Sequence, residues 1–235
     1  MKNAFKMFGI IAIAALIGFW SVSCGDDDDS GGGNAISGNT ITSGAEVVYD
    51  SYIEDVAEAK KVTDFGFRGY WDENNDTEEY KPLSYFFDGS SSVKISNGKV
   101  TINLGTPKSA YLQTINGMFK EGVTVNPINA KICQIYGFTS FDGKYDLYCP
   151  IDYNKQVEVQ VILVYADRNV TVKGSSTYSD KEDEQHTDIN NVSLKKGWNY
   201  LISSYNETTK TCTYTSSTTL PSGPKWTVYE NNYYY

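Results

Sequence analysis

Histidine-based catalysis has a single candidate in this sequence, because the chain contains one histidine, His186. It lies in a run of acidic residues between Asp180 and Asp188, which is typical of a solvated turn. A Ser-His-Asp site would also need a nucleophile on a strained turn such as G-x-S-x-G, and the chain has no such motif. Zinc sites built from several imidazoles or thiolates at ligand spacing are equally absent. We therefore expect His186 to be a solvated loop residue, and we predict no enzyme and no catalytic residue.

Oxygen ligands recur at every second position of one acidic segment, in a pattern that resembles the first half of a calcium-binding loop. These positions are Asp72, Asn74, Asp76 and Glu78. Thr77 stands where such loops have glycine, and Leu83 where they have a bidentate glutamate. We therefore favour a solvated acidic loop, with calcium as the alternative, and expect no metal and no cofactor.

Aromatic and polar residues gather just before this segment, where Tyr70, Trp71 and Asp72 follow one another. Sugars stack their C–H faces on exposed rings, while carboxylates take their hydroxyl groups, so these three residues are a candidate glycan platform. Burial is the commoner fate of large aromatic side chains on strands. The alternative is therefore that these rings belong to the hydrophobic core.

The charge balance limits the partners of the chain. There are 29 acidic and 20 basic side chains, for a formal net charge of −9, and arginine occurs only as Arg68 and Arg168. This disfavours nucleic acid and anionic lipid surfaces. A cluster that grips phosphate is also not expected.

The N-terminal residues have the pattern of an export signal. Lys2 and Lys6 precede an apolar run over residues 7–20, which is short for a membrane span. Ser21-Val22-Ser23-Cys24-Gly25 then resembles the lipobox of bacterial lipoproteins, which implies that residues 1–23 are removed and that Cys24 carries the lipid, including palmitate. The alternative is an ordinary cleaved signal with an incidental cysteine.

The segment after Cys24 contains no apolar side chain that a core could bury. Residues 24–34 are rich in glycine and include four consecutive aspartates, so we predict a solvated acidic tether. Acidic runs after a lipidated cysteine also resemble the signals that send some lipoproteins to the cell surface. We therefore expect a lipid anchor in the cell envelope, at the outer membrane and exposed at the surface.

Residues 35–235 are predicted to form one mainly β domain. Asn97-Gly98 within Val93–Leu104 predicts a hairpin, and the apolar run Val157–Tyr165 predicts a central strand covered on both faces. Leu83–Phe87 reads as a further strand, while apolar spacing over residues 109–120 predicts a short helix. Regular strand spacing with Gly, Asn and Asp turns favours an immunoglobulin- or transthyretin-like antiparallel β-sandwich with one short helix.

Three further cysteines follow the tether, namely Cys133, Cys149 and Cys212. Cys133 and Cys149 flank the turn-like residues 141–144 almost symmetrically, so on adjacent strands they are a candidate disulfide. The alternative is that all three are packed as small buried apolar residues.

The segment 192–200, Val-Ser-Leu-Lys-Lys-Gly-Trp-Asn-Tyr, resembles a strand–turn–strand motif of repetitive bacterial surface lipoproteins. Residues 97–107 and 221–226 resemble other parts of that pattern, although the family brings no catalytic residues. Together these features predict a lipoprotein that displays a binding or interaction module for a glycan or a protein at the cell envelope. The alternatives are a glycan-active enzyme with paired carboxylates and a structural envelope protein.

Overall fold

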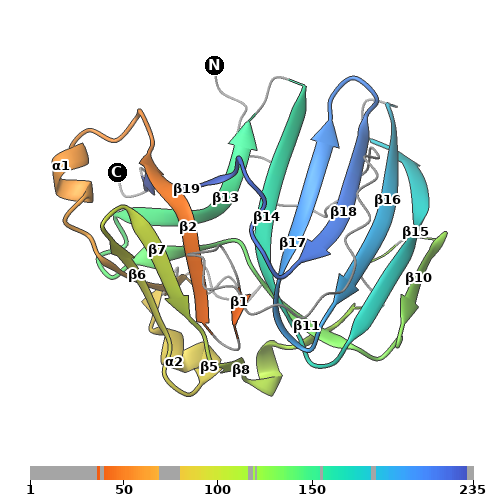
Figure 1. The fold of residues 1–235 in the computed structure, drawn as a ribbon, viewed down its shortest axis with the longest axis horizontal. Helices are drawn as coiled ribbons and strands as arrows, with labels where there is room; N and C mark the ends of the chain where they lie inside the picture. The colour runs from red at the N-terminus through yellow and green to blue at the C-terminus, as the bar shows by residue number, and fades with distance from the viewer. Residues whose placement is uncertain are drawn as a thin grey trace, which may run out of the picture.

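A computed structural model describes most of the chain after the predicted tether: residues 36–37, 40–68, 80–115, 119, 121–153, 156–180 and 184–231. These residues are mainly β, as predicted. The strands belong to a 17-stranded sheet and to a separate two-stranded pair. Figure 1 shows two regions of the large sheet side by side, a closed barrel and an open extension.

The barrel closes because β2 and β7 pair at the end of a ring of hydrogen-bonded neighbours. Its order is β2, β19, β13, β12, β3, β6, β7 and back to β2. The bounds are Thr40–Tyr49 (β2), Asp64–Arg68 (β3), Ser92–Ser96 (β6), Lys99–Asn103 (β7), Gly137–Ser140 (β12), Tyr145–Tyr153 (β13) and Lys225–Glu230 (β19).

The extension is built on β14, which pairs along its whole length with β17. From there the order runs through β18, β16 and β15 to β10, and β11 and β9 lie on the other side of β14. The bounds are Gln113–Thr114 (β9), Val123–Asn126 (β10), Lys131–Ile135 (β11), Val157–Ala166 (β14), Val170–Ser179 (β15), Gln185–Leu194 (β16), Gly197–Asn206 (β17) and Thr211–Ser217 (β18).

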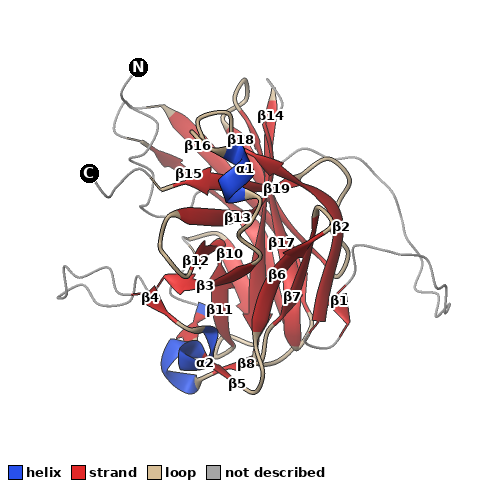
Figure 2. Cartoon of the chain, turned by 90° about the vertical axis from the view of Figure 1, so that its left-hand side faces the viewer, coloured by secondary structure: helices blue, strands red, loops and turns tan. Residues whose placement is uncertain are grey.

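Short elements complete the fold. Two helices, α1 (Val56–Ala59) and α2 (Leu83–Phe86), lie at opposite ends of the barrel in Figure 2. The remaining pieces are Ile36–Ser37 (β1), Tyr80–Lys81 (β4), Phe87–Asp88 (β5), Thr106–Pro107 (β8) and the 3-10 turn Ser109–Tyr111 (η1).

One strand, β13, joins the two regions. Its first half pairs with β12 and β19 in the barrel, whereas Ile151–Tyr153 pairs with β14 of the extension. The register of β13 against β19 shifts between Tyr148 and Ile151, where Pro150 cannot donate a ladder hydrogen bond. The large sheet therefore bends at β13 and closes on itself at one end. Its pairs β2–β19 and β16–β18 are parallel, so the sheet is not wholly antiparallel.

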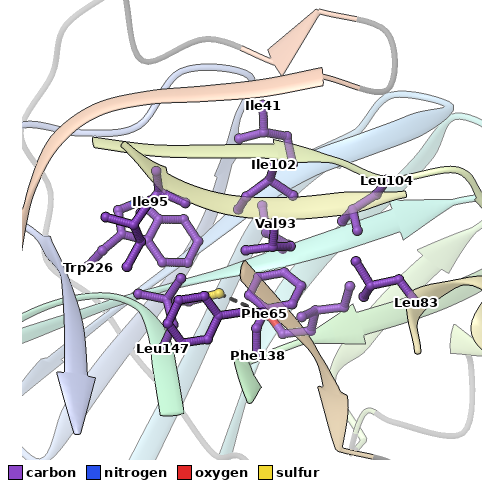
Figure 3. Close-up of a cluster of buried hydrophobic side chains, with 14 of the residues drawn as sticks. Ile41, Phe65, Leu83, Val93, Ile95, Ile102, Leu104, Phe138, Leu147 and Trp226 are labelled. Carbon is purple, nitrogen blue, oxygen red and sulfur yellow. Dashed lines mark hydrogen bonds between the residues drawn. The ribbon is translucent and has the colours of Figure 1, made fainter. Parts of the chain in front are cut away.

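Two hydrophobic cores lie on opposite faces of β14. Val161, Leu163 and Tyr165 belong to the barrel core, while Ile162 and Val164 belong to the core of the extension. The prediction of a central strand covered on both faces is thus confirmed. Figure 3 shows the barrel core, in which residues from β2, β3, β6, β7, β12, β13 and β19 meet.

The predicted hairpin is confirmed as β6 and β7. Asn97 and Gly98 have φ values of 51° and 71°, and the left-handed backbone at both positions is what a type I′ turn requires. Val93, Ile95, Val100 and Ile102 are buried while the residues between them face outward or are partly covered, as the alternation predicted.

Two local predictions are wrong. In the predicted helix, residues 109–111 form a 3-10 turn and Gln113–Thr114 pairs with β11, because pairing with a strand outweighed the helical apolar spacing. In the predicted strand Leu83–Phe87, the first four residues form α2 instead. This one-turn helix buries Leu83 and Phe86 on the same side.

The candidate disulfide is not formed, since Cys133 and Cys149 are both free, buried thiols. The register explains why: Gly137 pairs with Tyr148, which places Cys149 beside Tyr136 instead of Cys133. Cys133 lies opposite Tyr165 of β14, and burial raises the pKa of its thiol to about 12. Packing as small apolar residues therefore describes both cysteines.

Candidate functional site

A shallow groove of about 350 Å³ lies on the outer face of the barrel, where β2, β19 and the second half of β13 run side by side (Figure 1). Ten residues line it: Val48, Tyr49, Asp50, Ser51, Ile151, Asp152, Gly223, Lys225, Thr227 and Tyr229. The volume falls at the lower end of the range of about 300–1,000 Å³ for small-molecule sites. We refer to these ten residues as the barrel groove.

Strand β19 places three side chains in the groove through simple alternation. Trp226 and Val228 are fully buried in the barrel, so Lys225, Thr227 and Tyr229 point to the opposite face. The buried indole and valine anchor the strand. The outward side chains are thereby held at fixed spacing along the groove.

Gly223 brings a loop up to the carboxylate of Asp152 at one rim. The glycine has φ of +113°, and a Cβ at this position would lie 2.9 Å from Asp152 Oδ2. A larger residue would therefore meet both backbone strain and the carboxylate. Strand β13 contributes Asp152 on the extension side of the register shift.

Asp50 is held at the end of β2 by hydrogen bonds on three sides. Its N–H donates to Val228 O (2.9 Å), its Oδ1 accepts from the Tyr52 N–H (2.8 Å), and its carbonyl accepts from the Ile53 N–H (3.3 Å). The first and third bonds fix the backbone, and the bond to Oδ1 holds the carboxylate in a local turn, so Asp50 loses little freedom when it contacts a ligand. Asp50, just after β2, and Asp152, in β13, both line the groove.

Two tyrosines supply aromatic surface to the groove. Tyr229 packs edge to face on Tyr148 at 5.2 Å between ring centroids, and Tyr49 carries Lys60 Nζ 5.6 Å from its ring centre. Burial raises the pKa of the Tyr49 hydroxyl above its ordinary value. Tyr229 points outward, away from the buried Val228, and its position suits stacking against a flat ligand face. Tyr49 packs against the barrel core and has Lys60 over its ring, so it closes one side of the groove.

The charged side chains of the groove are mixed in sign. Lys225 Nζ lies 3.0 Å from Glu46 Oε2, in an exposed pair at the rim. With two aspartates, one paired lysine, a threonine hydroxyl and two tyrosines, the groove offers hydrogen-bond donors and acceptors around aromatic surface. Such a set fits an uncharged, hydroxyl-rich ligand better than a phosphate or a long apolar chain.

Most residues that the sequence singled out lie outside the described residues. This applies to Cys24, to the platform residues Tyr70 and Trp71, and to the candidate calcium ligands Asp72, Asn74, Asp76 and Glu78. His186 is described, and the prediction of a solvated loop residue is wrong: it lies in β16, and its side chain is only 13% exposed.

Sequence reasoning missed the groove residues. Asp50 and Asp152 lie 102 positions apart in the chain, and only the pairing of β19 with both β2 and β13 brings their strands together. The available signal was the alternation of Lys225–Tyr229, which indicates that Lys225, Thr227 and Tyr229 share a face.

Comparison with known proteins gave no match to a family model, a curated protein or a solved structure. None of the helices in the described part of the chain has the length and apolar character needed to cross a membrane. The chemistry of the site therefore rests on its own geometry.

Proposed function

We propose that this chain is a lipid-anchored protein of the bacterial cell envelope whose barrel groove binds an uncharged glycan. The observation that carries the proposal is that an outward-facing tyrosine, Tyr229, and two aspartates, Asp50 and Asp152, line one groove. Proteins bind sugars by stacking an aromatic ring on the C–H face of the pyranose while carboxylates and hydroxyls take its hydroxyl groups. Tyr229 would supply the first contact, and Asp50, Asp152 and Thr227 the second.

The charge of the chain supports the choice of an uncharged ligand. A net charge of −9 disfavours polyanions such as acidic polysaccharides or nucleic acid. Lys225 is already paired with Glu46, so the groove has little positive charge to spare for a carboxylate or sulfate.

The location is proposed from the N-terminal sequence. Lipidation of Cys24 would hold the domain at the outer membrane, and the acidic residues 24–34 would space it from the surface and favour display outward. Replacing Cys24 with Ser should release a folded protein from the membrane fraction. Continued membrane association of that variant would contradict the anchor.

Of the β-sandwich predicted from the sequence, we propose only the face-to-face packing of the extension on the barrel. Trp198 and Tyr200 of β17 belong to the barrel core, so this layer packs face to face on the barrel. An immunoglobulin- or transthyretin-like strand order beyond this contact stays a prediction.

The second candidate function is hydrolysis of a glycan by paired carboxylates. It is favoured by the presence of both Asp50 and Asp152 in the groove, since most glycosidases use two such groups, one as acid and one as nucleophile or base. Release of reducing sugar that is lost in both Asp50→Asn and Asp152→Asn would establish the enzyme. Binding without turnover supports recognition alone.

The test of binding is a glycan array screened with the purified full chain, followed by titration of the selected sugar. We expect Tyr229→Ala and Asp152→Asn each to weaken binding at least tenfold. Tyr52→Ala is the matched control, because Tyr52 is 83% exposed, follows Asp50 closely and does not line the groove. Equal affinity in all three variants, or no sugar bound, would leave the structural envelope protein as the better account.

A further inference from the structure

Three potential metal ligands converge at the far end of the extension, away from the barrel groove. Asp180, Glu184 and His186 each contribute one atom, and these atoms lie within 4.8 Å of one another. The group stands where β15 ends and β16 begins (Figure 1). It is the one such group of three among the residues that the structure describes.

Backbone pairing brings the three residues together. The Asp180 N–H donates to Glu184 O (3.0 Å), and the Glu184 N–H donates to Asp180 Oδ1 (2.9 Å). His186 pairs with Tyr178 in the antiparallel register of the two strands. The positions of Asp180, Glu184 and His186 therefore follow from the hairpin.

The imidazole of His186 is fixed by aromatic neighbours on two strands. Tyr178 of β15 stacks on it at 5.3 Å and 16°, and Tyr205 of β17 faces it at 6.4 Å and 18°. This orientation points Nε2 at Asp180 Oδ2, 3.1 Å away. This is a hydrogen-bond distance. Two ligands about 2.0–2.2 Å from a tetrahedral zinc ion lie roughly 3.3–3.6 Å apart, so the pair would open by roughly a few tenths of an ångström to hold an ion.

A cation already lies against the third ligand. Lys210 has a left-handed backbone with φ of 47°, and its Nζ lies 3.0 Å from Glu184 Oε2 and 2.6 Å from Glu207 Oε1. A metal ion that binds Glu184 would therefore replace Lys210 as the partner of this carboxylate. The side chain of Glu184 is 47% exposed, and one of its carboxylate oxygens lies within 4.8 Å of the ligand atoms of Asp180 and His186.

We propose that Asp180, Glu184 and His186 bind one divalent transition metal ion, with Zn²⁺ as the expected ion. An imidazole with two carboxylates suits zinc, whereas calcium and magnesium prefer sites made wholly of oxygen ligands. Three protein ligands leave a fourth position open to water or to a ligand of the metal. The site stands independently of the glycan groove.

The test is a Zn²⁺ titration of the purified full chain against a chromophoric chelator. We expect one equivalent to bind, with affinity lowered at least tenfold in His186→Phe, which keeps an aromatic ring for Tyr178 and Tyr205 but removes the nitrogen. Glu184→Gln should weaken binding by a similar factor. Glu207→Gln is the matched control, since it contacts Lys210 but is not one of the three ligands, and its affinity should stay within twofold.

Circular dichroism melting of each variant shows that the domain is folded before the titration is read. Equal zinc affinity in the parent and in His186→Phe would overturn the proposal, because the ion would then bind elsewhere, for example at the four aspartates 26–29. Absence of binding by the folded parent protein would overturn it as well.

Discussion

The barrel and the extension are built from the same sheet but are filled differently. In the barrel, Trp226, Phe138 and Leu147 are almost wholly buried in an apolar interior. The inner face of the extension begins with apolar residues such as Val164 and Val172, and then carries polar side chains toward the end where His186 lies. A closed and filled barrel leaves recognition to its outer face, whereas the open sheet places polar groups at its own rim.

The polar end of the extension is visible along β16. Asp188 and Asn190 point to the same side as the buried Val192 and Leu194. They are only 6% and 4% exposed although their side chains are polar. Buried carboxylates and amides are costly unless they are hydrogen-bonded, so such residues are uncommon in a purely structural core. We therefore expect the large apolar core of the barrel to contribute more to stability than the polar end of the extension.

The largest effect is expected in the barrel. Replacing Trp226 with Ala removes a fully buried ring that packs beside Phe138 at 6.5 Å, and should lower the free energy of unfolding by about 3–5 kcal/mol. Denaturant unfolding of the purified domain measures the loss. A loss below about 1 kcal/mol would contradict the view that the barrel interior is the main source of stability.

A smaller effect is expected where the chain before β10 lies close to its antiparallel neighbour β15. Gly174 has φ of +124°, and a Cβ there would lie 2.1 Å from Gly122 O, so Gly174→Ala should cost about 1–3 kcal/mol. Gly98→Ala is the control, because it has positive φ but open space around it, and should cost only about 1 kcal/mol. Equal losses of unfolding free energy in the two variants would show that Gly174 and Gly122 are not in tight contact.

Glu158 gives a pH-dependent prediction for the extension. Burial raises the pKa of this carboxyl, so its contribution to stability is fully present below its ordinary pKa and is lost as pH rises through the raised value. Because the side chain is only partly buried, Glu158→Gln should stabilise the protein by only about 0.5 kcal/mol at pH 7, and by nothing near pH 4. Thermal melts at both pH values measure this difference. A gain at pH 4 that equals the gain at pH 7 would rule out ionisation as the cause.

The smallest effect is expected at the rim of the barrel groove. Lys225→Met removes an exposed ion pair with Glu46, and should change the free energy of unfolding by less than about 0.5 kcal/mol. Denaturant titration checks this value. A loss above about 1 kcal/mol would mean that the rim residue supports the barrel rather than the groove.

Local structure was well predicted where one pattern determined it. The Asn97-Gly98 sequence predicted the hairpin turn, and the apolar run of β14 predicted a strand buried on both faces. Residues 109–120 were not predicted correctly from local pattern. Their apolar spacing favours a helix, but Gln113–Thr114 pairs with β11, a strand that only the complete fold places beside it.

Both sites depend on residues from strands that are separated in the sequence, so they could not be predicted from local patterns. Asp152 lines the groove after the register shift of β13 around Pro150. No residue near Asp50 in the sequence indicates that Asp152 lies in the same groove. His186 looked like a loop residue because its neighbours are acidic. The stacking of Tyr178 and Tyr205 on its ring depends on the order of strands in the extension.

The most direct test of the central claim is hydrogen exchange of the full chain with and without the glycan selected on the array. Binding in the barrel groove predicts slower exchange of backbone amides in residues 48–53 and 222–229, with little change over residues 178–188. Protection confined to the extension, or no protection at a saturating concentration of the sugar, would contradict the assignment of recognition to the barrel groove.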